Sequence, residues 1–106
     1  MRILTLLAAL TAPIAAQSAT SPIYRTIGDV ELRLHIDRAE SKNAPAIVFF
    51  FGGGWVGGSP SQFEPQAAHL VSRGVTAIRA EYRIQRKHGT TPQDAVADAQ
   101  AALAWV

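Results

Sequence analysis

The chain has no cysteine, and this absence excludes several kinds of site. It rules out a disulfide framework, a thiolate zinc site and a thiol nucleophile. The three histidines, His35, His69 and His88, do not stand at the spacing of metal ligands. The sequence also has no run of like charge, and its formal net charge is only +2. We therefore expect no metal, no cofactor and no nucleic-acid partner.

The first sixteen residues have the pattern of a secretory signal peptide. Arg2 supplies a positive charge, and Ile3 to Ile14 carries none. This apolar stretch is shorter than the roughly 20 residues that a membrane span needs. Small residues then predict cleavage after Ala16 or after Ser18, although a buried N-terminal helix is the alternative. The mature part, residues 17–106, is expected to form part of one domain and to be secreted or periplasmic.

The mature part alternates strand-like and helix-like segments, which predicts an α/β fold with parallel strands. Val30 to Ile36 alternates apolar and polar residues, as a half-buried strand does. Ala46 to Phe51 is continuously apolar, which is typical of a strand buried on both faces. The expected elements are a hairpin of strands 23–27 and 30–36, strand 46–51, helix 65–73 after an entry turn at 61–64, strand 75–82, a basic loop at 83–89, and helix 92–106.

Local signals place the ends of the two helices. Pro65 fits the first turn of one helix, and Gly74 fits the position just after its end. Thr91 is the expected N-cap of the other helix, with Pro92 at its first position. The apolar face of that helix is expected at 95, 96, 99, 102, 103 and 106. No stop signal precedes Val106, so we expect the sequence to be cut inside this helix.

The segment Gly52 to Gly58 holds five glycines and admits two interpretations. Gly52, Gly54 and Gly57 spell G-x-G-x-x-G, and Glu81 follows the next strand, as in a dinucleotide-binding domain. A delayed helix and the bulky Trp55 oppose this interpretation. The other interpretation is an oxyanion hole, in which successive backbone N–H groups stabilise a developing negative charge.

One stretch of the sequence resembles the α/β-hydrolase superfamily, in particular secreted esterases with an H-G-G-G-W motif. These include hormone-sensitive-lipase-type carboxylesterases and bifunctional feruloyl and acetyl-xylan esterases. The resemblance covers residues 23–106 and rests on Phe49-Phe50-Phe51-Gly52-Gly53-Gly54-Trp55, Gly58-Ser59-Pro60, Phe63, Gly74 and Glu81-Tyr82-Arg83-Ile84. It implies the amino-terminal part of a hydrolase sheet that acts on a small-molecule or polysaccharide-linked ester.

The resemblance also implies roles for individual residues. The N–H groups of Gly53 and Gly54 would be the oxyanion donors. Trp55 would line the acyl pocket, or else pack beneath the loop. The first residue of the motif is usually histidine, but here it is Phe51, which would have to brace the loop by packing. The layout of the family further implies an ion pair between Arg83 and Asp98, worth only about 0–1 kcal/mol if partly exposed.

A serine esterase also needs a nucleophile in a G-x-S-x-G elbow, and the chain has none. The chain order in this fold is serine, then acid, then histidine, so all three catalytic residues are expected beyond Val106. None of the three histidines is then the catalytic base. We therefore expect the amino-terminal portion of a secreted serine esterase, inactive by itself. The alternative is a non-catalytic secreted binding module that uses the glycine loop.

Overall fold

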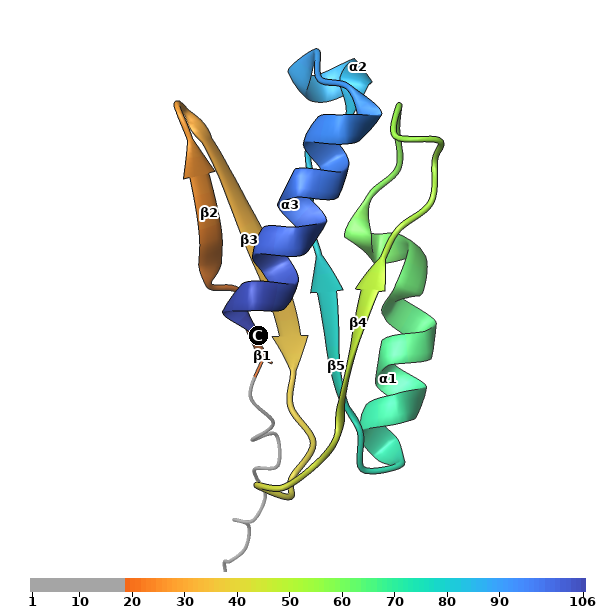
Figure 1. The fold of residues 1–106 in the computed structure, drawn as a ribbon. Coiled ribbons are helices and arrows are strands. Elements are labelled where there is room, and N and C mark those ends of the chain that lie inside the picture. Colours follow the sequence, from red (N-terminus) through yellow and green to blue (C-terminus); the bar gives the residue numbers. More distant parts are fainter. Residues whose placement is uncertain (1–18) are drawn as a thin grey trace, which may run out of the picture.

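The computed structural model describes residues 19–106, so the predicted signal peptide lies outside the described residues. These residues form a mixed five-stranded sheet with helices packed on it (Figure 1). The strands are β1 (Ala19–Thr20), β2 (Ile23–Ile27), β3 (Val30–Asp37), β4 (Ala46–Phe50) and β5 (Thr76–Ala80). The helices are the 3-10 turn η2 (Pro60–Phe63), α1 (Glu64–Ser72), α2 (Gln85–His88) and α3 (Pro92–Trp105).

The hairpin predicted from alternation is confirmed, since β2 pairs antiparallel with β3. Gly28, with φ 58°, makes the turn that its missing side chain permits. On β3 the apolar side chains of Leu32, Leu34 and Ile36 are all buried, while their polar neighbours point to the other face. The period of two in the sequence therefore defines which face of β3 belongs to the core.

Strands β4 and β5 are parallel and adjacent, and β3 lies antiparallel on the other side of β5. The order is β1-β3-β5-β4, so within residues 19–106 β4 is an edge strand with β5 as its only partner. The expectation that 46–51 is buried on both faces is met only by Phe51, which is buried. Ala46 and Ile47 are exposed, and Val48 to Phe50 are only partly buried. An apolar strand is buried by its neighbours, and here one side of β4 has none.

The two long helices cover opposite faces of the sheet (Figure 1). Ala102 of α3 packs in one buried cluster with Ile36 and Ile78. Arg79, the next residue along β5, points the other way and pairs with Glu64 of α1 at 3.5 Å. This arrangement places the carboxyl ends of β4 and β5, and the loops that follow them, at one end of the molecule.

Helix α1 begins and ends where the local signals indicate, to within one residue. The predicted entry turn is the 3-10 turn η2, whose Ser59 hydroxyl oxygen accepts a hydrogen bond from the Ser61 N–H. Pro65 lies in the first turn of α1. Gly74, at φ 88°, takes the left-handed conformation that ends the helix.

The basic segment 83–89, expected to be a loop, contains the short helix α2. The Ile84 N–H donates to His88 Nδ1 at 3.0 Å, which closes this single turn through a side chain. Gly89 then ends it in the left-handed conformation, with φ 67°. Four residues are too few for a periodic apolar pattern, so the sequence carried no helical signal here.

The buried face of α3 also differs from the expected one. Ala95, Asp98 and Ala102 are buried, whereas Val96 and Leu103 are about half exposed. The expected apolar face did not include Asp98, because that pattern counts only apolar residues, although an ion pair with Arg83 was expected there. Its burial is compensated by two arginines, described below.

The start of α3 is a capping box that makes a testable contribution to stability. Thr91 Oγ1 accepts from the Asp94 N–H at 3.2 Å, and Asp94 Oδ2 accepts from the Thr91 N–H at 3.0 Å. The hydrogen bonds that the Asp94 carboxylate accepts from the Thr91 N–H and, at 3.1 Å, from the Thr91 hydroxyl lower the pKa of Asp94 below its ordinary value. A lowered carboxyl pKa gives stability that is present at neutral pH and is lost as the pH falls through that pKa.

We expect Thr91→Ala to lower the free energy of unfolding by about 1 kcal/mol at pH 7, and by less at a pH below the lowered pKa of Asp94. Urea denaturation followed by circular dichroism at the two pH values measures both effects. Thr91→Ser keeps the hydroxyl and should retain most of the stability. A loss that is equally large at both pH values would contradict the carboxylate's part in the cap.

Candidate active site

The glycine-rich loop, residues 52–58, starts where β4 ends, at the carboxyl end of a parallel strand. The Gly53 carbonyl oxygen accepts from the Val56 N–H at 3.1 Å and from the Gly57 N–H at 3.3 Å. The loop thus folds back on itself as a closed turn. Ligands in α/β sheets bind at this end of the strands, which makes the loop the first candidate for a site.

Helix α2 holds the loop from the side through backbone hydrogen bonds. The Gln85 N–H donates to the Trp55 carbonyl at 2.9 Å, and the Arg86 N–H donates to the Val56 carbonyl at 3.0 Å. These are N–H groups at the start of a helix, which have no partner within the helix itself. The loop is therefore fixed by α2, an element that the sequence did not predict.

The position of Phe51, where the resemblance led us to expect histidine, is braced by packing. Its ring stacks on Tyr82, with centroids 4.3 Å apart and planes at 15°. The Tyr82 hydroxyl donates to the Phe51 carbonyl oxygen. The next residue, Gly52, donates its N–H to Gln62 Oε1 at 2.7 Å. An aromatic stack and two hydrogen bonds thus hold the entry to the loop.

The loop backbone takes conformations that few residues can adopt. Gly53 has φ 148°, and a Cβ added there would lie 2.2 Å from the Gly57 carbonyl oxygen. Gly54 and Trp55 are both left-handed, with φ 64° and 63°. For a tryptophan this costs about 1–2 kcal/mol. Such strain is typical of functional loops that are fixed by their surroundings.

Three consecutive N–H groups of the loop stay available to a ligand. Within residues 19–106, the N–H groups of Gly53, Gly54 and Trp55 donate to no acceptor. The same residues line a groove of about 380 Å³ whose other walls are apolar. Those walls are Phe50, Phe51, Tyr82, Ala95, Val96 and Ala99. A carbonyl oxygen in this groove could meet several preorganised donors.

A larger hollow, about 1,080 Å³, lies at the opposite end of the sheet. It is lined by the starts of β4 and β5 and by Trp105 and Val106. It includes neither the glycine loop nor a histidine. Size alone would make it the leading candidate, but the chemistry favours the smaller groove.

The structure brings Arg83 and Asp98 together, and adds Arg25, which sequence reasoning missed. Asp98 is fully buried, and its oxygens accept from Arg83 Nε at 2.9 Å and Nη2 at 3.0 Å. They also accept from the Arg83 N–H at 2.9 Å and from Arg25 Nη1 at 2.7 Å. The hydrogen bond to Asp98 raises the pKa of Arg83. The pair is therefore buried, not the partly exposed pair that we had considered.

His35 lies on the polar face of β3 and is only partly exposed. Its side chain is only 29% exposed, and its Nε2 lies 2.8 Å from Glu81 Oε2. The Nδ1 atom lies 3.1 Å from Ser21 Oγ. Periodicity correctly put His35 on the face away from Leu34, but the partners come from segments far away in the sequence. His69, on α1, is exposed.

The described residues contain neither a metal-binding cluster nor a membrane-spanning helix. No group of three His, Asp or Glu side chains within residues 19–106 is placed to hold a metal ion. None of the helices in that range is long and apolar enough to cross a membrane.

The fold of this chain is similar to that of solved esterase structures. A thermophilic esterase from Thermogutta terrifontis with bound propionate is 41% identical and superposes with a TM-score of 0.78, over 83% of this chain and 34% of that one. The same enzyme phosphonylated by sarin is 40% identical, with a TM-score of 0.79, over 92% and 37%. This level of agreement shows the α/β-hydrolase fold for the described part.

Sequence comparison agrees with the structural likeness. Carboxylesterase NlhH of Mycobacterium tuberculosis is 33% identical over 85 residues, which are 78% of this chain and 26% of that protein. The chain thus spans about a quarter of its curated relatives and about a third of the similar structures. A family model named BD-FAE matches residues 32–106, which include the glycine loop, α2 and α3. The chain therefore belongs to the BD-FAE family of α/β-hydrolase esterases.

Proposed function

We propose that these residues form the amino-terminal part of a serine carboxylic-ester hydrolase and supply its oxyanion hole. The observation that carries the proposal is the set of unpartnered N–H groups at Gly53 and Gly54, beside an apolar groove. In acyl transfer the carbonyl oxygen becomes negatively charged in the transition state, and each preorganised donor contributes about 3–4 kcal/mol. Trp55, half exposed beside the groove, would border the acyl group of the substrate.

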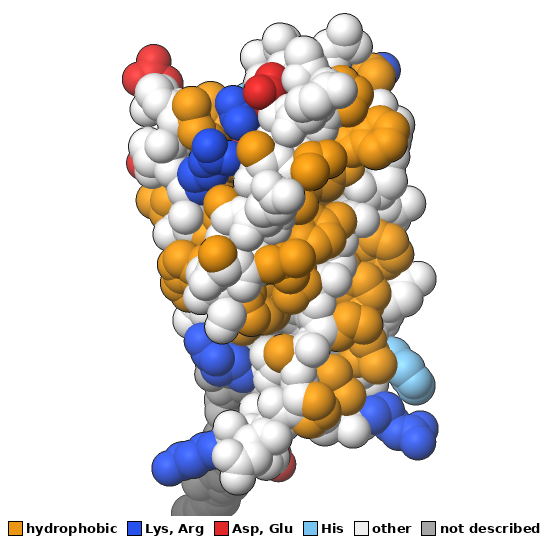
Figure 2. Space-filling model, viewed as in Figure 1, with side chains coloured by type: hydrophobic (Ala, Val, Ile, Leu, Met, Phe, Trp, Pro, Cys, Tyr) orange, Lys and Arg blue, Asp and Glu red, His pale blue; other side chains and the backbone are white. Residues whose placement is uncertain are grey.

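The nucleophile would come from a further strand beside β4. No serine of the chain stands in G-x-S-x-G, and within residues 19–106 one edge of β4 is unpaired. A band of apolar side chains runs beside α3 and β4 (Figure 2). The exposed large apolar side chains on β4 and α3 are Ile47, Val96, Leu103 and Trp105. A parallel strand added at this edge would end next to the glycine loop.

The substrate class proposed is a small ester with a short acyl chain. The Thermogutta terrifontis structures were obtained with propionate and with butyrate bound. Here the groove between the loop and α3 is small and mostly apolar, which suits a short chain. An ester linked to a polysaccharide is a more specific proposal within this substrate class. The signal-peptide pattern of the first sixteen residues supports secretion.

The test compares the 106-residue chain with the protein that its gene produces, purified from the culture medium. We expect the 106-residue chain to give no burst and no turnover with p-nitrophenyl propionate. A gene product of the length of its relatives should hydrolyse this ester and should lack the first sixteen to eighteen residues. A stoichiometric burst from the 106-residue chain would overturn the proposal. Propionate binding without hydrolysis by the gene product would instead establish the binding-module alternative.

A further inference from the structure

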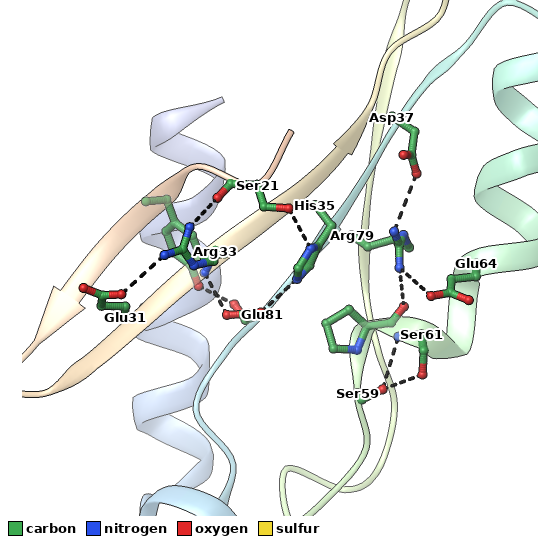
Figure 3. Close-up of polar contacts among 12 residues, drawn as sticks. Ser21, Glu31, Arg33, His35, Asp37, Ser59, Ser61, Glu64, Arg79 and Glu81 are labelled. Atoms are coloured by element: carbon green, nitrogen blue, oxygen red, sulfur yellow. Dashed lines mark hydrogen bonds and ion pairs between the residues drawn. The ribbon is translucent and has the colours of Figure 1, made fainter. Parts of the chain in front are cut away.

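A second cluster of polar side chains lies on the face of the sheet away from α3 (Figure 3). Ser21 lies between β1 and β2, His35 lies on β3, and Glu81 directly follows β5. These positions are far apart in the sequence and belong to three separate segments. The cluster is separate from the glycine loop and takes no part in the function proposed above.

The three side chains form a continuous hydrogen-bonded chain. Ser21 Oγ lies 3.1 Å from His35 Nδ1, and His35 Nε2 lies 2.8 Å from Glu81 Oε2. A carboxylate can only accept, so the ring nitrogen that faces Glu81 carries the proton. In the neutral ring, Nδ1 is then the basic nitrogen, and the Ser21 hydroxyl donates to it. This is the arrangement of nucleophile, base and orienting acid that activates a hydroxyl.

Arg33 fixes both ends of this chain. Its backbone N–H donates to the second carboxylate oxygen of Glu81 at 2.9 Å, so the acid cannot rotate freely. Its guanidinium Nη1 donates to the carbonyl oxygen of Ser21 at 2.8 Å. This second bond holds the backbone of Ser21 in place. The Leu34 N–H also donates to the Pro22 carbonyl at 2.9 Å, which holds the segment against β3.

The cluster is open to small molecules. Ser21 is exposed, and the side chains of His35 and Glu81 are 29% and 30% exposed. None of the cavities described above includes Ser21 or His35. Such a site can react with a compact electrophile, but it offers no walls to select a large substrate.

From this geometry we propose that Ser21 is a second, base-activated nucleophile that accepts acyl or phosphonyl groups from small reactive electrophiles. With a fluorophosphonate, a bond forms between Ser21 Oγ and phosphorus, and the phosphorus–fluorine bond breaks. Fluoride leaves, and the proton of the hydroxyl passes to His35 Nδ1. Glu81 keeps the ring oriented and stabilises the imidazolium that forms.

The test is site mapping after exposure of the 106-residue chain to a fluorophosphonate probe. Fragmentation mass spectrometry locates the adduct, which separates Ser21 from its neighbour Ser18. We expect label on Ser21 and none on the exposed Ser41, Ser61 and Ser72, which serve as internal controls. In a longer product, a serine in G-x-S-x-G would fall in a different peptide, so the result is independent of the esterase proposal.

Variants separate activation from mere exposure. His35→Gln should slow labelling of Ser21 about 100-fold or more, since general-base catalysis contributes about 10²–10⁴. Glu81→Gln should also slow it while keeping an acceptor for the Arg33 N–H. His69→Gln, which replaces an exposed histidine on α1, should leave the rate unchanged. Circular dichroism checks that each variant is folded. An unlabelled Ser21 in the unaltered chain, or labelling that persists in folded His35→Gln, would overturn the proposal.

Discussion

Gly53→Ala should lower kcat of the ester hydrolase by about 100-fold or more in a protein that carries the nucleophile. The new Cβ would lie 2.2 Å from the Gly57 carbonyl oxygen, which is backbone and cannot rotate away. At φ 148° the conformation is also one that side-chain-bearing residues rarely adopt. The loop must therefore move, and the N–H groups of residues 53 and 54 no longer point at the same oxygen atom.

Two matched variants isolate the cause of this loss. Gly54→Ala meets no atom within 4 Å, so it adds left-handed strain but no clash. Gly28→Ala adds the same kind of strain in the β2–β3 turn, also in open space and far from the loop in sequence. We expect Gly28→Ala to cost about 1 kcal/mol of stability and to leave kcat unaffected. The kcat of Gly54→Ala should lie between the kcat values of Gly53→Ala and Gly28→Ala.

Steady-state kinetics with p-nitrophenyl propionate, together with urea denaturation of each variant, measures these effects. If Gly53→Ala and Gly28→Ala gave the same kcat, the glycine loop would not supply the oxyanion donors. A fall in kcat at unchanged stability would identify the loop as catalytic machinery and not as a folding element.

The second large effect is expected from Asp98→Ala, which should lower the free energy of unfolding by about 3–5 kcal/mol. Asp98 is fully buried, and the Arg83 side chain beside it is 12% exposed. Removing the carboxylate leaves the guanidiniums of Arg25 and Arg83 without their counter-charge. It also leaves the Arg83 N–H without its acceptor. An uncompensated buried charge costs more than the ion pair itself contributes.

Two control variants distinguish the loss of a buried ion pair from the loss of a charge at the surface. Glu31→Ala breaks an exposed ion pair with Arg33, whose two side chains are 54% and 42% exposed, and should cost at most about 1 kcal/mol. Asp98→Asn keeps the shape but not the charge, and should retain only part of the stability. Urea denaturation followed by circular dichroism measures all three. A cost for Asp98→Ala no greater than that for Glu31→Ala would refute the buried clamp.

The clamp also connects the fold to the site. It ties β2 and α3 to the backbone of Arg83, the residue after Tyr82. Tyr82 in turn stacks on Phe51 at the entry to the glycine loop. Disturbing Asp98 should therefore loosen the loop as well as the domain.

Local signals in the sequence determined the parts of this protein that depend on neighbouring residues. Alternation defined the buried face of β3, and the signals at Thr91 and Gly74 placed helix ends. The run of glycines identified the segment that forms the candidate site. These features depend on backbone preferences and on which residues share a face, and a sequence records both directly.

Tertiary structure alone decided which distant groups meet. The sequence could not indicate that Arg25 joins Arg83 on Asp98, or that Ser21 and Glu81 lie at the two nitrogens of His35. These contacts depend on strand register and on helix placement, and they connect residues up to 73 positions apart. A buried charge also breaks the rule that charged side chains lie at the surface, because its specific partners offset the cost of taking it out of water. Only the folded chain brings those partners together.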